Sequence, residues 1–375
     1  MANYPLHPEF LKKQGNIALR ERALVAIAAH VEVRALLRAA YELRGLGLDD
    51  VLIGSYARRV SIWPGKDVDV FGRLMDETVH SIDPDAAYGA FLRALAPYAD
   101  QGRLTPQPRS LKIAFGPDRV PAAAAIRQAA AEYQWEPAEV ERVVGNLDHH
   151  AFEFSVDVVP AVPFEGHYGI PEIERQTSTG ECYRTGGWRK TNPVKLTELS
   201  QERNRYPKIG GVGAYKRTVR AVRQVKSHHL RDAKPSSLYF ELILYEGFAR
   251  GAVAGDTWAD ITASALRYIA GRLSTAESDP VGDPVLQEPY APAPSSAELE
   301  IARAVFDREA RRAELACANG RCQAAIDWRE VFGGNKKLVH VFPLPEGCRG
   351  TGAAMGLAGA NVASGGTAER SFGGD

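Results

Sequence analysis

Three aspartates in two short segments are the residues most able to do chemistry. Asp67 and Asp69 lie two residues apart in DVDVFGRL, and Asp157 lies in FEFSVDVVP. Side chains of a strand alternate between its faces, so a strand places Asp67 and Asp69 on one face and Val68 with Val70 on the other. Like charges held together repel unless a cation lies between them, and carboxylate oxygens are the hard ligands that Mg²⁺ prefers. The spacing therefore predicts a site for two Mg²⁺ ions, with Mn²⁺ as an alternative.

A Gly-Ser pair precedes this acidic segment. Gly54 and Ser55 stand where the short apolar strand DDVLI ends and a helical piece begins. Glycine permits close backbone approach, and the N–H groups at a helix start attract phosphate. An Asp-x-Asp segment by itself is more often a pair of solvent-exposed carboxylates than a metal site. A Gly-Ser pair by itself is even weaker evidence for a functional site. Together, the turn and the three strand carboxylates favour two-metal phosphoryl or nucleotidyl transfer.

The elements around these residues predict a mixed α and β core. Apolar residues recur at three- and four-residue spacing over 16–44, which is typical of a long amphipathic helix. Alternation of β-branched and polar residues predicts the strands that contain the candidate site residues. The predicted strands are 49–53, 67–74, 110–116 and 150–164, and further helices are predicted at 83–96 and, as an Ala-rich insertion, within 121–147.

The second half of the chain has a different, helical texture. We expect an α+β nucleotidyltransferase-type core over 1–205 and a helical domain over 206–348 that completes the active-site cleft. Residues 349–375 form a Gly- and Ala-rich tail that buries too little to order itself. The helices expected in the second half are 214–230, 237–252, 258–273 and 296–318.

Composition limits the class of protein. The 375 residues include 46 Lys plus Arg and 46 Asp plus Glu, so the net charge is zero, which argues against wholesale binding of a nucleic-acid backbone. No apolar run approaches the roughly 20 residues of a membrane span, and the N-terminus lacks a signal-peptide pattern. These features predict a cytoplasmic protein that needs no disulfides. Cys317 and Cys322 are too few ligands for a zinc site.

At these residues the sequence resembles the DNA polymerase β-like nucleotidyltransferases. GSYARRVSIWPGKDVDVFGRL is similar to their Gly-Ser and Asp-x-Asp signature. Within that superfamily, the sequence resembles the bacterial relatives of cyclic GMP-AMP synthase and oligoadenylate synthase, which make signal nucleotides in anti-phage defence. VDVVPAVP, YGIPEIE with GWRKTNP, VRAVRQVKSHH and DWREVFGGNKKLVHVFP extend the resemblance over about residues 15 to 345.

The resemblance implies roles for the core residues. Gly54 and Ser55 would hold the donor triphosphate, and Asp67 and Asp69 would bind both metals. Asp157 would bind the metal that activates the attacking hydroxyl.

The resemblance also implies triphosphate contacts from the helical domain. Lys226 would contact the phosphates, although basic residues recur every three positions around it and a solvated helix face is the alternative. Ser237 matches a phosphate-binding serine four residues before Glu241. The tyrosine that follows that serine in the family is Leu238 here, so its role is lost unless Tyr239 supplies it.

The resemblance predicts an enzyme rather than a binding module. It would join nucleoside triphosphates, ATP among them, into a cyclic or linear oligonucleotide second messenger and release pyrophosphate. One alternative is a template-independent RNA nucleotidyltransferase of the CCA-adding type, which a neutral chain without a further RNA-binding domain disfavours. A catalytically dead nucleotide-binding scaffold is another, but such a scaffold has no need to hold three carboxylates together. Neither a membrane nor a nucleic acid is expected as a partner, and the sequence does not identify an activating protein.

Overall fold

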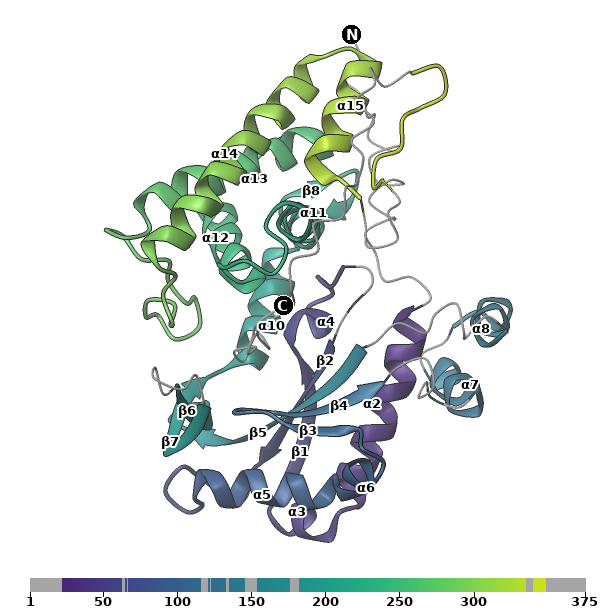
Figure 1. Cartoon of the computed structure of the whole chain (residues 1–375), viewed down its shortest axis with the longest axis vertical. Helices are drawn as coiled ribbons and strands as arrows, with labels where there is room; N and C mark the ends of the chain where they lie inside the picture. The colour runs from purple at the N-terminus through teal and green to yellow at the C-terminus, as the bar shows by residue number, and fades with distance from the viewer. Residues whose placement is uncertain are drawn as a thin grey trace. The chain divides into compact units, whose positions relative to one another are not determined.

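The chain divides into two compact units, each described by itself. The computed structural model describes residues 22–62, 65, 67–115, 121, 123–132, 135–145, 154–175, 182–334 and 340–348. Among these, the sheet unit comprises residues 22–202 with Pro284–Glu288, and the helical unit comprises Arg203–Asp283 with 289–348 (Figure 1). The predicted start of the first helix at 16–21, the predicted start of the strand at 150–153 and the predicted tail 349–375 lie outside the described residues.

The sheet unit is built on a mixed sheet in the order β1-β2-β5-β4-β3. β2 and β5 run parallel, whereas the other neighbours in this order are antiparallel. This confirms the predicted α+β class, while β3 and the hairpin of β6 and β7 were not predicted. The strands are β1 (Leu48–Ile53), β2 (Asp67–Leu74), β3 (Leu104–Pro106), β4 (Leu111–Phe115), β5 (Phe154–Phe164), β6 (His167–Arg175) and β7 (Cys182–Thr191).

One face of this sheet carries the apolar core. Val68 and Val70 of β2 lie in register with Val156 and Val158 of β5, and all four are buried. Ile113 of β4 continues the row from Val156. The helices α2 (Arg22–Ala39) and α5 (Pro84–Ala94) contribute the other side of the same cluster. The valines therefore lie on the core face and the aspartates on the opposite face, as the alternation in the sequence predicts.

The first helix is shorter than the sequence predicts. It is interrupted at Ala40, whose ψ of 118° is extended, and α3 (Tyr41–Gly45) follows. No Gly or Pro marks this break. Tertiary contacts account for it: Leu43 is fully buried in the core, and Glu42 is ion-paired with Arg93 of α5.

Two helices form the predicted insertion between β4 and β5. They are α7 (Ala123–Glu132) and α8 (Pro137–Val144), and α7 packs against α2 (Figure 1). Pro137 at the first position of α8 suits a helix start. The remaining helices of the sheet unit are α4 (Gly54–Ala57), α6 (Ala96–Asp100) and α10 (Pro193–Arg203).

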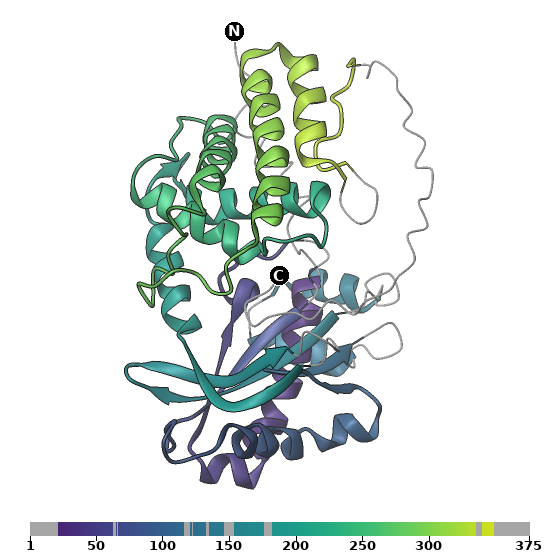
Figure 2. The same cartoon turned by 60° about the vertical axis from the view of Figure 1, so that its left-hand side comes forward.

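The helical unit contains the short strands β8 (Lys208–Ile209) and β9 (Val212–Gly213), which precede its helices. Its helices begin at side-chain caps where the sequence supplies them: Ser236, Thr257 and Ser295 each accept a hydrogen bond from a backbone N–H in the first turn that follows. Figure 2 gives a second view of these helices. They are α11 (Ala214–His229), α12 (Ser237–Ala249), α13 (Trp258–Thr275), α14 (Ser296–Ala318) and α15 (Arg321–Phe332).

The cysteines differ from the prediction. Cys322 at the start of α15 is disulfide-bonded to Cys348, 26 residues away, and Cys317 remains a free thiol. The pairing arises from packing of the segment after α15, which local spacing could not reveal.

Among the helices that the structure describes, none combines the length and the apolar composition that a membrane crossing requires.

Candidate active site

The strand register brings the predicted carboxylates onto one face of two neighbouring strands. Asp69 of β2 lies directly beside Asp157 of β5, and Asp67 lies beside Ser155. These positions alternate with the buried valines of the core, so Asp67, Asp69 and Asp157 share the opposite face. Asp157 is buried, with 6% of its surface exposed, whereas Asp67 and Asp69 are half-buried.

Gly54 lies against Asp69 at the end of β1. Its φ of +71° is in the left-handed region that favours glycine. A Cβ atom at this position would lie 1.8 Å from Oδ2 of Asp69. Ile53, the preceding residue, is in register with Asp69. The glycine is therefore required both by its backbone conformation and by the aspartate that lies against it.

Ser55 is held by a neighbour that the sequence did not identify. Its Oγ lies 2.9 Å from Oγ of Ser61, and the backbone N–H of Val60 donates to the carbonyl of Ser55. These contacts fold residues 54–61 into a compact turn. The Ser55 hydroxyl thus has a fixed position beside the acidic face rather than a freely rotating one.

Behind this turn lies a buried histidine. The ring of His30 on α2 meets that of Tyr56 edge-on, with centroids 5.8 Å apart. Burial, reinforced by the charge of Arg34, lowers the pKa of His30 to about 4. At neutral pH the imidazole is therefore uncharged. It packs the turn against α2 without adding charge to the acidic face.

The site contains two further residues that sequence reasoning missed. Lys112 of β4 is in register with Asp157, which completes the row Asp69, Asp157, Lys112 across three strands. Ser155 is buried, and its Oγ has no hydrogen-bond partner among the described residues. The alternation of apolar and other residues in LKIAF could have predicted that Lys112 lies on the face opposite to the core.

The chemistry of the donor set fits a divalent cation, although the side chains do not already form a ligand cluster. In the part of the chain that the structure describes, no three His, Cys, Asp or Glu side chains converge as metal ligands. The three aspartates nevertheless supply only hard oxygen donors, and the register makes two of them direct neighbours. Like charges at this spacing are stabilised by a bound cation.

The two predicted residues of the helical unit lie on separate helices. Lys226 is on the last turn of α11 and is 3% exposed, and Ser237 is the first residue of α12. The N-cap of α12 is Ser236, whose Oγ accepts from the N–H of Tyr239 at 3.3 Å. Tyr239 is buried against Tyr290, with ring centroids 5.5 Å apart, and burial raises its pKa to about 12. Tyr239 is therefore a packing residue of α12.

No protein-family model and no curated protein matches the chain. Solved structures do match over most of its length. The chain is similar to CdnC of Escherichia coli MS115-1, at 13% identity and a TM-score of 0.56, over 87% of this chain and 96% of that one. It is also similar to CdnE of Capnocytophaga granulosa, at 12% identity and a TM-score of 0.55, over 84% of this chain and 88% of that one.

A third similar structure is that of CdnG of Bradyrhizobium diazoefficiens, at 13% identity and a TM-score of 0.54. The match covers 84% of this chain and 94% of that one. The chain thus has the fold of the bacterial nucleotidyltransferases that CdnC, CdnE and CdnG represent. The fold implied by the sequence resemblance is confirmed.

Proposed function

We propose that this protein is a Mg²⁺-dependent nucleotidyltransferase that makes a cyclic or linear oligonucleotide second messenger from nucleoside triphosphates. The observation that carries the proposal is the register of β2 and β5. It sets Asp69 beside Asp157 with Asp67 on the same face, and it places Gly54 against Asp69. A role in anti-phage defence and a cytoplasmic location are part of the same proposal.

Proteins of similar fold support this class of reaction. The Capnocytophaga protein is a c-di-GMP synthase. The Bradyrhizobium protein was solved with GTP, and Escherichia coli DncV, at a TM-score of 0.52, with 3'-deoxy GTP. Their ligands are nucleotides, in line with the acidic, phosphate-oriented site proposed here. We extend the nucleoside triphosphate substrate to this chain on that basis, with ATP as the first candidate.

In the proposed reaction, a hydroxyl oxygen of the acceptor attacks the α-phosphorus of the donor triphosphate. A new P–O bond forms, the bond to the β-phosphate oxygen breaks, and pyrophosphate leaves with the electron pair. Bound Mg²⁺ would neutralise phosphate charge and ease deprotonation of the attacking hydroxyl. Asp67 and Asp69 would hold both cations, and Asp157 would bind the cation that activates the attacking hydroxyl.

The Gly54–Ser55 turn would position the donor. The Ser55 hydroxyl, fixed beside Ser61, can donate a hydrogen bond to a phosphate oxygen. Gly54 leaves the adjacent carboxylate of Asp69 in place because it has no Cβ. Orientation of this kind supplies much of the rate enhancement in phosphoryl transfer, since there is little covalent chemistry for the protein to perform.

The helical unit would add the remaining contacts. We propose that Lys226 offsets triphosphate charge and that the Ser237 hydroxyl donates to a phosphate. In this scheme residues 1–205 form the catalytic core and residues 206–348 complete the cleft.

The direct test is incubation of the purified protein with labelled nucleoside triphosphates and Mg²⁺, with and without RNA, followed by mass spectrometry. A small oligonucleotide and pyrophosphate support the proposal. Elongation of the RNA without a small product would show a tailing enzyme instead, and no transfer under any condition would show a scaffold.

The roles of the carboxylates can be separated by charge-removing variants. Asp67→Asn and Asp69→Asn should weaken binding of a non-hydrolysable triphosphate in Mg²⁺ and abolish transfer. Asp157→Asn should abolish transfer while sparing much of the donor affinity, because it lacks only the acceptor-side ligand. Calorimetric titration with product assays on the same proteins decides the question. Equal loss of donor binding in all three variants contradicts this division.

A further inference from the structure

Two arginines of α11 have no carboxylate partner among the described residues, unlike Arg267 and Arg272 of α13. Arg217 and Arg220 are three residues apart, so their side chains are neighbours on one side of the helix. Both are half-buried. Neither forms an ion pair or a hydrogen bond with any residue that the structure describes.

The charge around Arg220 is unfavourable. Burial lowers its pKa to about 10, and the second cause is the positive charge of Arg217. Burial also lowers the pKa of Arg217. Removing a cation from water costs free energy, and a like charge three residues away adds to that cost. Among the described residues, the fold therefore holds these two partly desolvated cations together without an anionic partner.

The surroundings of Arg217 add further positive potential. Its guanidinium carbon lies 5.7 Å from the ring centroid of Trp258, and Trp258 is the first residue of α13. The N-terminal end of an 18-residue helix carries partial positive charge. The carboxylate of Asp260, in the first turn of α13, accepts a hydrogen bond from Oγ1 of the N-cap residue Thr257 at 2.6 Å, and among the described residues it forms no ion pair with Arg217.

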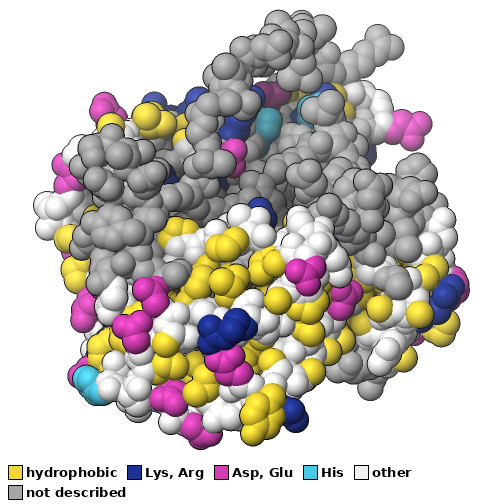
Figure 3. Space-filling view, turned by 60° about the horizontal axis from the view of Figure 1, so that its bottom comes forward, with side chains coloured by type: hydrophobic (Ala, Val, Ile, Leu, Met, Phe, Trp, Pro, Cys, Tyr) yellow, Lys and Arg dark blue, Asp and Glu magenta, His cyan; other side chains and the backbone are white. Residues whose placement is uncertain are grey.

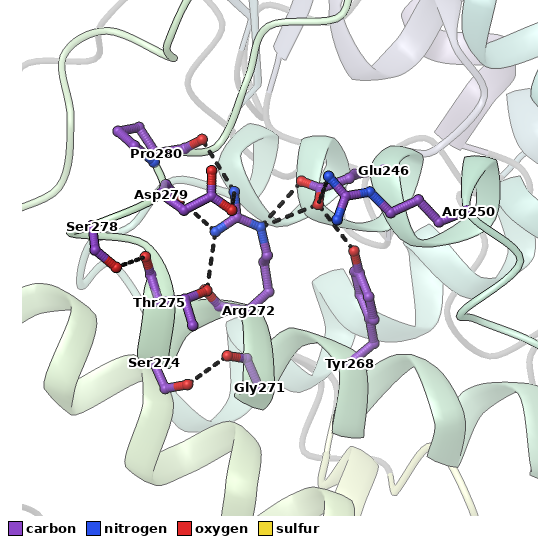
Figure 4. A network of polar contacts seen from close by, with 10 residues as sticks. All are labelled: Glu246, Arg250, Tyr268, Gly271, Arg272, Ser274, Thr275, Ser278, Asp279 and Pro280. Carbon is purple, nitrogen blue, oxygen red and sulfur yellow. Dashed lines mark hydrogen bonds and ion pairs between the residues drawn. The ribbon is translucent and has the colours of Figure 1, made fainter.

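A buried arginine of the same unit shows how the fold neutralises a cation when no ligand is involved. Arg272 of α13 is ion-paired with Glu246 at 3.1 Å and with Asp279 at 3.5 Å (Figure 4). It also donates to the carbonyls of Asp279 and Pro280, at 2.6 and 3.1 Å. Its guanidinium is thus surrounded by acceptors, whereas Arg217 and Arg220 face each other's charge.

We propose that Arg217 and Arg220 form a binding site for a phosphoryl group, separate from the donor site assigned to Lys226. A guanidinium group can donate two parallel hydrogen bonds to the oxygens of one phosphate. A bound phosphate would therefore supply the missing anion for both side chains. Arg220 and Lys226 are six residues apart, a rise of about 9 Å along the helix. A second phosphorylated molecule, either free pyrophosphate or a nucleotide, therefore fits this position. Only its identification as a nucleotide rests on the proposed function.

The test is calorimetric titration of the full chain with inorganic pyrophosphate and, separately, with ADP, both in EDTA. Without divalent cations the acidic face cannot hold phosphate, which leaves the two arginines and Lys226 as binding groups, and the double variant removes only the arginines. The double variant Arg217→Gln/Arg220→Gln should lose at least about tenfold in affinity for both probes. The tighter of the two probes in the unmodified protein identifies the source of the phosphate.

Matched variants keep the test specific. Arg267→Gln removes an arginine that is paired with Asp307 and Glu314 on α14, and it should leave both affinities unchanged. The double variant should have an equal or higher melting temperature, because it removes a like-charge pair. Unchanged affinity in the double variant, or equal loss in Arg267→Gln, overturns the proposal. Loss of affinity in the double variant together with no oligonucleotide product from the unmodified protein would refute only the proposed function.

Discussion

Two kinds of charged region in this molecule differ in how their charges are balanced. Asp50 in the sheet unit is buried against both Arg34 and Arg38, and Arg272 in the helical unit is enclosed by acceptors. In contrast, the aspartates of β2 and β5 share one face, and Arg217 lies beside Arg220 on α11. The first kind stabilises the fold, whereas the second kind gathers like charge, which costs stability.

Some surface charges follow the first pattern. On the face shown in Figure 3, a Lys or Arg side chain near the centre lies against an Asp or Glu side chain. Glu42 with Arg93 and Glu141 with Arg127 are two such pairs of the sheet unit. These pairs neutralise charge at the surface, whereas the acidic face and the two arginines of α11 gather like charge.

The largest effect should come from crowding the acidic face at Gly54. Gly54→Ala should reduce product formation at least about a hundredfold, because its Cβ would displace the carboxylate of Asp69. Gly102→Ala is the matched control, since Gly102 has a similar φ of +63° but a Cβ there would have no described atom within 4 Å. Product assays and melting temperatures of both variants check this. Equal activity in the two would contradict the role given to Gly54.

Breaking a neutralised region should instead affect stability. Asp50→Asn should lower the free energy of unfolding by about 3 to 5 kcal/mol, because it leaves the guanidinium groups of Arg34 and Arg38 against a buried position without their anion. Urea unfolding measures the change. A loss below about 1 kcal/mol would show that the pair is not a stabilising one.

Protonation of His30 should make stability depend on pH. Its folded pKa of about 4 lies below the ordinary histidine value of 6.5, so the neutral form is favoured in the fold. The contribution of neutral His30 to the free energy of unfolding is fully present above about pH 6.5. It is lost as the pH falls toward 4, by about 3 kcal/mol in total. Urea unfolding at several pH values should show a shallower slope in this window for His30→Phe. An unchanged slope would rule out this contribution.

The smallest effect should come from a neutralised pair at the surface. Arg267 contacts Asp307 and Glu314, but about 41% of its side chain is exposed. Arg267→Gln should therefore cost less than about 1 kcal/mol, and less at high salt, since water and ions screen exposed pairs. Thermal unfolding in low and high salt measures it. A larger or salt-independent loss of unfolding free energy would contradict this and would show that Arg267 contributes as a buried arginine does.

Strand alternation predicted the part of the site that lies within single segments. It separated Asp67 and Asp69 from Val68 and Val70, and it turned Asp157 away from the core. The side-by-side position of Asp69 and Asp157 depends on strand order, which local periodicity does not contain. The place of Lys112 in this row was missed for the same reason.

Tertiary packing explains the other differences. The break at Ala40 has no local signal and follows from the burial of Leu43 beyond it. The bond between Cys322 and Cys348 joins residues that only the folded chain brings together. The row of basic residues on α11 was visible in the sequence, but a periodic pattern does not say which of them lack an anion.

The parallel pairing of β2 with β5 has a consequence for how the chain can change in evolution. Asp69 and Asp157 meet only after the intervening strands and helices have been closed into a loop. Closure entropy grows slowly with loop length, by about 0.6 kcal/mol for each doubling. An insertion such as α7 with α8 is therefore inexpensive. A shift of β5 by one residue would instead set a valine beside Asp69, so lineages of this fold can vary freely in connection length while their strand alignment stays unchanged.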